Sequence, residues 1–178
     1  MSNSDDGELL FGAKRITAAN MMQPDVSRLF GARTEAEWIA LFADQKLADY
    51  VPEPIQKLFE LARGTMTYAW LYYPLLALGY IECTKTLEAA ARHAAAAAGT
   101  PKALDGKEKS YADVIKQLHT KRLLDDAAMK RWTLGRELRN AFAHPTDSAI
   151  LPPSYASEKL RMTADRINQL FAAVRSLA

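Results

Sequence analysis

Apolar side chains recur every three or four residues along the second half of the chain, which is the spacing of one face of an α-helix. Between Tyr155 and Leu177 they are Leu160, Ala164, Ile167, Phe171 and Val174. In the stretch that begins at Asp125 or Asp126 they are Ala128, Trp132, Gly135, Leu138 and Phe142. This pattern predicts two amphipathic helices, each with one face turned toward a core.

Capping and breaking residues predict two helices in the first third of the chain. Thr34–Glu37 forms a capping box, so we expect a helix from there to near Tyr50. Proline is favoured at the first position of a helix and glycine just after the last. A short helix is therefore expected from Pro54 to Arg63, closed by Gly64.

A longer helical region, from Thr65 to Ala98, is expected next. Pro74 lies inside it and removes an internal hydrogen bond, so it either kinks the helix or restarts it. Ser110 is placed to cap a further helix from Tyr111 to about Leu123.

The whole pattern predicts an all-α protein, a helical bundle of four principal helices with extra N-terminal helices and an arm. No Asn-Gly or Asp-Gly hairpin separates alternating apolar runs, and no repeat of 20–50 residues is evident. Residues 1–33 are interrupted by glycine and proline, so they are expected to be an arm or a partner-binding segment. Residues 34–178 are expected to form the bundle.

Charge is distributed unevenly in this chain of 178 residues, although its formal net charge is only +2. Seven basic side chains lie between Lys116 and Arg139, against three acidic ones. Such an excess can attract phosphate, but it is also typical of a solvated helix face. A polycation that binds nucleic acid with its whole surface is excluded.

The compartment is expected to be the cytoplasm. Cys83 is the only cysteine, which excludes an intrachain disulfide and is consistent with a small core residue in a reducing compartment. The N-terminus lacks the basic and apolar segments of a signal peptide. The most apolar window, Tyr68–Ile81, is too short to span a bilayer, so no membrane association is expected.

The stretch RELRNAFAHP, from Arg136 to Pro145, combines chemical side chains that a core helix does not need. Arg136, Arg139 and Asn140 fall on a side about 100° from the apolar stripe of the same helix. His144 precedes a proline and is therefore pushed out of the helical region. From the residues alone, His144 is either an accessible chemical group or a cap at the end of the helix.

An arginine and an accessible histidine suffice for cleaving RNA without a metal. Histidine can remove a proton from the ribose 2′-hydroxyl or give one to the leaving oxygen. Arginine can hold the phosphate as negative charge builds in the transition state. One histidine cannot easily act as both acid and base, so two copies facing each other in a dimer would supply two.

Arg139–His144 resembles the R-N-x3-H form of the R-x4-6-H motif of the HEPN superfamily. The resemblance extends over residues 55–178: an apolar helix with an embedded acid (GYIECTK, Gly79–Lys85), a polar loop, the motif helix, and a closing helix with INQLF (Ile167–Phe171). HEPN proteins are small helical bundles that typically dimerise. Many are metal-independent endoribonucleases in toxin–antitoxin and antiphage systems.

The resemblance implies that Arg139 and His144 are catalytic, with Asn140 as a supporting residue. RNA would be the substrate, a second copy of the chain the partner, and an antitoxin or defence-system protein a possible further partner. The alternative is a non-catalytic HEPN-like module that binds RNA or protein, or forms oligomers, within a defence complex. No cofactor or metal is expected, because no glycine-rich phosphate loop, H-E-x-x-H or paired-carboxylate site occurs.

Other candidates have weaker support. Arg136, Arg131 and Lys130 are candidate RNA contacts. Glu82 could orient the arginines of the motif helix, or it is a surface carboxylate or part of a salt bridge. His93 and His119 lack evident partners and are expected to be solvated or half-buried. The aromatic set Tyr68, Trp70, Tyr72, Tyr73 and Tyr80 is expected to be core or dimer interface rather than a base-stacking surface.

Overall fold

The computed structural model describes residues 16–25, 34–100, 109–143 and 151–177, with side chains except for residues 135–143. Six α-helices and no β-strand occur in these ranges, which confirms the predicted all-α class. The helices are α1 (Glu35–Ala43), α2 (Glu53–Tyr68), α3 (Leu75–Ala97), α4 (Tyr111–Thr120), α5 (Asp126–Ala143) and α6 (Pro153–Arg175). None of the described helices is both long and apolar enough to cross a membrane.

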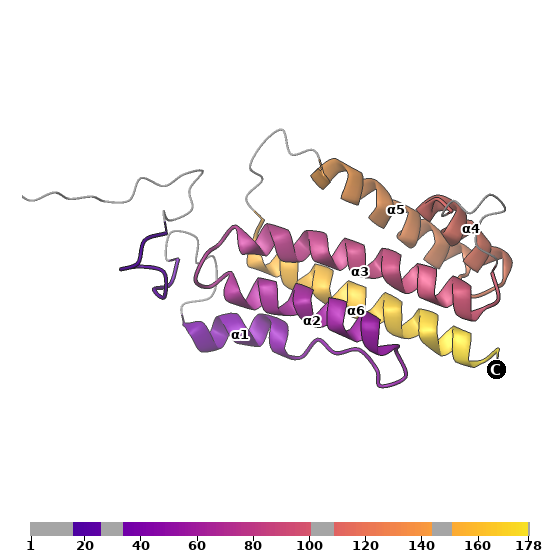
Figure 1. The fold of residues 1–178 in the computed structure, drawn as a ribbon, viewed down its shortest axis with the longest axis horizontal. Helices are drawn as coiled ribbons and strands as arrows, with labels where there is room; N and C mark the ends of the chain where they lie inside the picture. The colour runs from indigo at the N-terminus through magenta and orange to yellow at the C-terminus, as the bar shows by residue number, and fades with distance from the viewer. Residues whose placement is uncertain (1–15, 26–33, 101–108, 144–150, 178) are drawn as a thin grey trace, which may run out of the picture.

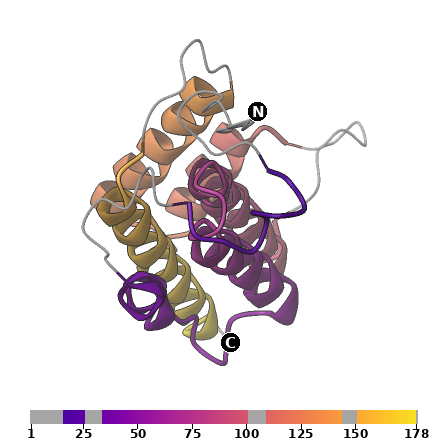
Figure 2. The same cartoon turned by 90° about the vertical axis from the view of Figure 1, so that its left-hand side faces the viewer.

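Three long helices, α2, α3 and α6, lie side by side along the long axis of the molecule (Figure 1). The short helix α1 packs against α2 and α6, and α4 packs against α3. Helix α5 contacts α4 and α3, and Figure 2 shows it on the opposite side of α6 from α1. The motif helix is therefore a peripheral element laid over a three-helix centre.

The tightest contact in the centre is the crossing of α2 and α3 at Gly79. A Cβ built on Gly79 would lie 2.5 Å from Met66 Cγ and 3.1 Å from the carbonyl oxygen of Ala62. No side chain fits there without moving α2, because interiors are packed at the density of crystals. Glycine at this position sets the distance between the two helices.

An aromatic cluster surrounds this crossing. Trp38 of α1 is fully buried, with ring centroids 5.8 Å from Phe42, 6.1 Å from Trp70 and 6.4 Å from Tyr73. Its indole nitrogen donates to the carbonyls of Met66 and Thr67 at 3.2 and 3.0 Å. Those carbonyls belong to the last turn of α2, where they also accept, at 3.3 Å, from the backbone nitrogens of Ala69 and Trp70. Trp38 thus joins α1 to the end of α2.

A second, mainly aliphatic cluster fills the other end of the bundle. It contains Leu87, Ala90, Ala91 and Ala94 of α3, Val114, Ile115 and Leu118 of α4, Trp132 of α5, and Ile167 and Phe171 of α6. The short alanine side chains of α3 let α4 and α5 approach it closely. The predicted buried residues of the α4 and α6 segments lie in the core as expected, except that Val174 is only partly buried at its edge.

Helix α1 ends at Ala43 rather than near Tyr50, so that prediction was wrong. The side-chain amide of Asn168 on α6 holds the segment that follows. Its oxygen accepts from the backbone nitrogen of Ala48 at 2.8 Å, and its nitrogen donates to the carbonyl of Lys46 at 3.2 Å. These bonds, made 120 residues along the chain, replace the ones that a longer helix would form.

Two other boundaries differ from expectation. Gly64 does not close a helix, because α2 continues through it to Tyr68 and buries Met66 on the way. Helix α4 ends at Thr120, three residues before the predicted Leu123. Of the two possibilities for Pro74, the structure has the restart: α2 ends first, and α3 begins at Leu75 directly after the proline.

Within the predicted N-terminal arm, residues 16–25 are described, and the rest of it lies outside the described residues. Asp25 is 2% exposed and joins this segment to the turn between α2 and α3. Its backbone nitrogen donates to the Trp70 carbonyl at 2.8 Å, and its carboxylate accepts from the backbone nitrogen of Tyr73 at 3.0 Å. The division at residue 33 stays a prediction.

We predict that Gly79→Ala lowers the free energy of unfolding by about 1–3 kcal/mol, because the added methyl group overpacks the α2–α3 crossing. Gly64→Ala is the matched control: nothing lies within 4 Å of a Cβ built there. It should raise stability by up to about 1 kcal/mol, because alanine favours a helix interior over glycine. Urea unfolding of both variants measures this, and equal effects would contradict the close crossing.

Candidate functional site

The N-terminal half of α5 is anchored in the bundle. Asp125 Oδ1 accepts from the backbone nitrogen of Ala128 at 2.6 Å, which caps the helix. Trp132 is 2% exposed and packs into the aliphatic cluster. His119 Nε2 lies 2.9 Å from Asp126 Oδ1, so the expectation that His119 lacks a partner was wrong. Exposed His93 agrees with its expectation.

The candidate catalytic residues belong to the other end of this helix. The backbone of Arg136, Arg139 and Asn140 lies in the last two turns of α5, which ends at Ala143. Their side chains, and His144 altogether, lie outside the described residues. The geometry between Arg139 and His144 therefore stays a prediction.

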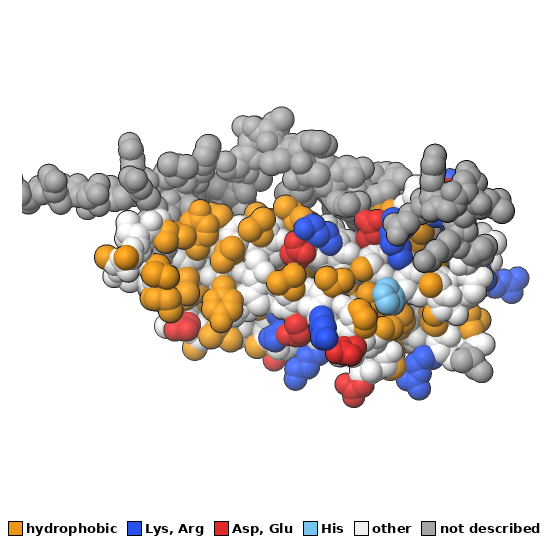
Figure 3. All heavy atoms as spheres, in the orientation of Figure 1, with side chains coloured by type: hydrophobic (Ala, Val, Ile, Leu, Met, Phe, Trp, Pro, Cys, Tyr) orange, Lys and Arg blue, Asp and Glu red, His pale blue; other side chains and the backbone are white. Residues whose placement is uncertain are grey.

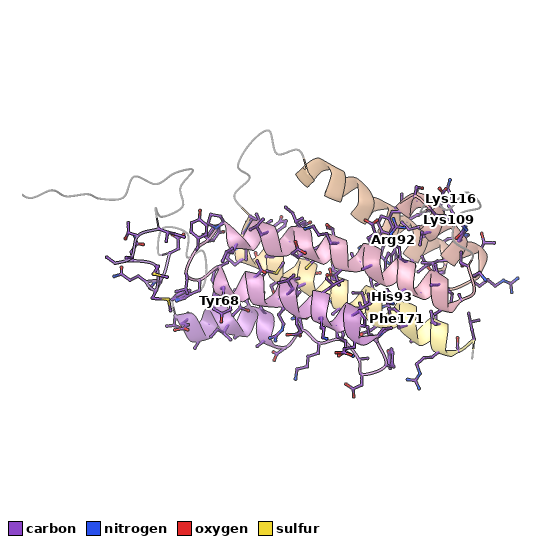
Figure 4. All side chains as sticks on the ribbon, viewed as in Figure 1. Tyr68, Arg92, His93, Lys109, Lys116 and Phe171 are labelled. Carbon is purple, nitrogen blue, oxygen red and sulfur yellow. The ribbon has the colours of Figure 1, made fainter. Side chains whose placement is uncertain are left out.

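The described members of the basic excess of residues 116–139 lie on α4, on α5 and in the turn between them. Lys116 is exposed on α4, at the end of the molecule where Figure 4 also places Arg92 and Lys109. Lys121 donates its ammonium to the carbonyl of Ala98 at 2.6 Å and so caps the end of α3. Arg122 occupies the turn between α4 and α5 with φ 60°.

The remaining charged candidates are surface residues among the described side chains. Lys130 and Arg131 are exposed on α5 and free to meet a polyanion from solvent. Glu82 is 21% exposed and forms an ion pair with Lys85 at 2.6 Å, one turn along α3. A role for Glu82 in orienting the α5 arginines stays a prediction.

The predicted aromatic set separates into core and surface. Trp70 and Tyr73 are buried, whereas Tyr68 is 65% exposed. Tyr68 lies near Leu61, Leu71 and Leu75 in sequence, and Figure 3 shows hydrophobic side chains gathered over this end of α2 and α3. The prediction of core is therefore confirmed for two members, and that of an interface is not tested.

A cavity of about 420 Å³ lies between α3, α5 and α6. Most of its polar lining comes from one face of α6, where Tyr155, Lys159, Met162 and Arg166 recur at helical spacing. This face lies about 100° around the helix from the core stripe. Tyr80, Leu134, Ser154, Glu158 and Thr163 complete the lining.

Lys159 is the most unusual side chain of this cavity. It is 7% exposed, and its ammonium lies 5.0 Å from the centre of the Tyr80 ring. Among the described residues it has no carboxylate partner, and burial lowers its pKa from 10.5 to about 8. The charge of Arg166 acts in the same direction. A buried ammonium without a counterion destabilises a fold, so this lysine calls for an explanation.

The neighbouring groups compensate the charge only in part: the Tyr80 ring offers a cation–π contact, and a Cys83 thiolate would raise the pKa of Lys159. Burial raises the pKa of Cys83 to about 12, so its thiol stays protonated near neutral pH and is a poor nucleophile. Burial also raises the pKa of Tyr80. Thr163 is fully buried and donates its hydroxyl to the carbonyl of Lys159 at 2.8 Å.

Arg166 connects the cavity to α5. Its Nη1 donates to the carbonyl of Arg131 at 3.1 Å. Burial lowers the pKa of the Arg166 guanidinium, and the charge of Arg131 lowers it further. Arg166 of α6 therefore lies next to Arg131 of α5, one of the predicted RNA contacts.

Sequence reasoning did not find Lys159 or Arg166, and it considered Tyr80 only as a core or interface residue. A usable signal was present: Tyr155, Lys159 and Arg166 fall on one face at i, i+4 and i+11, beside the apolar stripe of the same helix. No three His, Cys, Asp or Glu side chains within the described part of the chain gather closely enough to hold a metal ion.

We predict that Lys159→Met stabilises the protein at pH 7, because methionine keeps the apolar stem and removes the buried charge. A pKa lowered from 10.5 to about 8 corresponds to a cost of roughly 3 kcal/mol, which is the upper limit of the gain.

The sign follows from proton binding. Between about pH 8 and 10.5 the unfolded wild type binds more protons at this lysine than the folded one, so wild-type stability rises with pH. The advantage of Lys159→Met should therefore shrink over this range. Ionisation of Cys83 opposes the trend above pH 9. Because Lys159 lowers the pKa of Cys83, its removal does not weaken this opposing effect in the variant, so the advantage of the variant still shrinks. Urea unfolding at pH 7 and pH 10 measures the difference, and a less stable variant at pH 7 would refute the prediction.

In comparisons with protein-family models, with curated proteins and with solved structures, nothing matched this chain. A functional assignment therefore depends on the R-N-x3-H pattern at the end of α5 and on the cationic face of α6 beside it.

Proposed function

We propose that this protein is a metal-independent endoribonuclease of the HEPN type. The observation that carries the proposal is the R-N-x3-H pattern, Arg139–His144, at the end of a helix whose first half is firmly packed. The all-α bundle is consistent with it. The exposed cations Lys130 and Arg131 and the half-buried Arg166 add positive charge along the approach to the motif.

Cleavage would proceed by attack of a ribose 2′-oxygen on the adjacent phosphorus. A His144 imidazole removes the 2′-hydroxyl proton, and the bond to the 5′-oxygen breaks as that oxygen receives a proton. Arg139 holds the non-bridging oxygens, on which negative charge grows, and Asn140 fixes the imidazole. The products carry a 2′,3′-cyclic phosphate and a 5′-hydroxyl, and Arg136 contacts a flanking phosphate.

The protein would act as a homodimer with a composite cleft. One neutral imidazole is required as the base and one imidazolium as the acid, and these are opposite protonation states. Two copies of α5 that face each other supply both. The resemblance of the motif further suggests a toxin or antiphage-defence effector in the cytoplasm, controlled by an antitoxin or another defence-system protein.

We predict that the purified protein cleaves single-stranded RNA in the presence of EDTA. Arg139→Ala and His144→Ala should each lower the rate at least about 100-fold, since each removes a group that acts on the transition state. Gel analysis and end-group mapping of the products provide the measurement.

Matched controls are Arg63→Ala on α2 and His93→Ala on α3, which remove the same side-chain types from helices other than the motif helix. Both should cleave like wild type. If the motif variants and controls cleave alike, the catalytic assignment is wrong. If no protein cleaves RNA but the wild type binds it, the non-catalytic RNA-binding module is the better description of the function.

Mixing tests the composite cleft. When wild-type protein is re-equilibrated with an equal amount of His144→Ala, half of the wild-type protomers enter mixed dimers. If each cleft needs both histidines, activity should fall to about half of that of the wild type alone. If each protomer had an independent site, the activity would stay unchanged. The control is the same addition of a variant that cannot dimerise, which should also leave the activity unchanged.

A further inference from the structure

The cavity between α3, α5 and α6 has the composition of a site for an anion with an apolar part. Two cations, Lys159 and Arg166, line it together with Tyr80, Tyr155 and Met162. Its volume of about 420 Å³ falls in the range of small-molecule sites, which combine an apolar lining with a few polar groups.

The buried ammonium gives the strongest indication of what the cavity binds. Lys159 is more than nine-tenths buried, lines the cavity and has no carboxylate partner among the described residues. Arg166, two turns further along α6, lines the same cavity, so two like charges repel each other there. An anion between them would relieve both the repulsion and the lack of a counterion.

The acidic residue of the lining does not fulfil this role. Glu158 turns its carboxylate to Arg161, which donates to it at 2.8 and 2.6 Å. That pair is exposed on the outer side of α6. Its charges offset each other, so the described lining residues leave the cavity with the positive charge of Lys159 and Arg166.

The aromatic side chains specify the apolar part of the ligand. Tyr155 is 68% exposed at the cavity and lies one turn before Lys159 on the same face of α6. A flat ring can stack on it while an attached phosphate reaches the ammonium. This combination of a planar ring and a phosphate is a nucleotide.

We propose that this cavity binds one nucleotide unit, with its phosphate held by Lys159 and Arg166 and its base stacked on Tyr155. The nucleotide is either part of an RNA strand or free in solution. The RNA source rests on the proposed function: Leu134 lines the cavity only five residues, or about 7.5 Å of helix, before Arg139. The cavity would then hold a nucleotide beside the cleaved bond.

Binding is tested apart from cleavage with a 2′-O-methyl oligonucleotide, which has no free 2′-hydroxyl, and with AMP and inorganic phosphate as separate ligands. Lys159→Met should weaken the oligonucleotide and AMP at least about tenfold, the loss of one charge-assisted hydrogen bond. Lys57→Met makes the same change at a side chain that is 74% exposed on α2, and it should bind like wild type.

Tyr155→Ala is a second variant that leaves the core untouched. It should weaken AMP and the oligonucleotide but not inorganic phosphate, because only the base stacks on the ring. Thermal melting confirms that each variant is folded. Equal binding by wild type, Lys159→Met and Lys57→Met, or no binding of any ligand, overturns the proposal.

The outcomes separate this proposal from the proposed function. Lys159-dependent binding of the oligonucleotide supports RNA as the source, and binding of AMP alone supports a free nucleotide. Lys159-dependent binding without any cleavage of unmodified RNA supports the cavity and refutes the endoribonuclease. If the protein cleaves RNA equally well with and without Lys159→Met and the cavity binds no nucleotide, the proposal of a nucleotide site is refuted and the endoribonuclease is not.

Discussion

The close crossing of α2 and α3 at Gly79 is the constraint on which the other contacts depend. Because no side chain separates the helices there, the end of α2 lies where Trp38 can donate to the carbonyls of Met66 and Thr67. That bond fixes α1, and the same aromatic cluster receives Asp25 and the turn before α3. The close approach at Gly79 thus brings together the helix ends on which three segments distant in the sequence meet.

Helix α5 does two different things along its length. Its first half is structural: Trp132 enters the core, and Asp125 caps the first turn. Leu134, two residues after Trp132, lines the cavity instead, beside the face of α6 that carries Lys159 and Arg166. A cationic cavity lining thus lies directly next to a core contact of the same helix.

The sequence predicted the class of fold and most of the core, because apolar spacing and caps such as Ser110 are local signals. The prediction failed where contacts with other parts of the chain determine where a helix ends or whether a side chain is buried. Gly64 was expected to end a helix, but burial of Met66 carries α2 past it. The site was predictable only as far as the motif. Whether Lys159 is solvated or buried depends on where α5 lies over α6, and no pattern within α6 contains that information.

The amide of Asn168 also has a consequence for the order in which the chain can assemble. It bonds to both Lys46 and Ala48, so the segment after α1 receives part of its support from a residue near the end of the chain. During synthesis, α2 and α3 can pair as neighbours and α1 can dock on α2 through Trp38, whereas these two bonds must wait until α6 has left the ribosome. A segment made early is therefore among the last parts of the bundle to be secured.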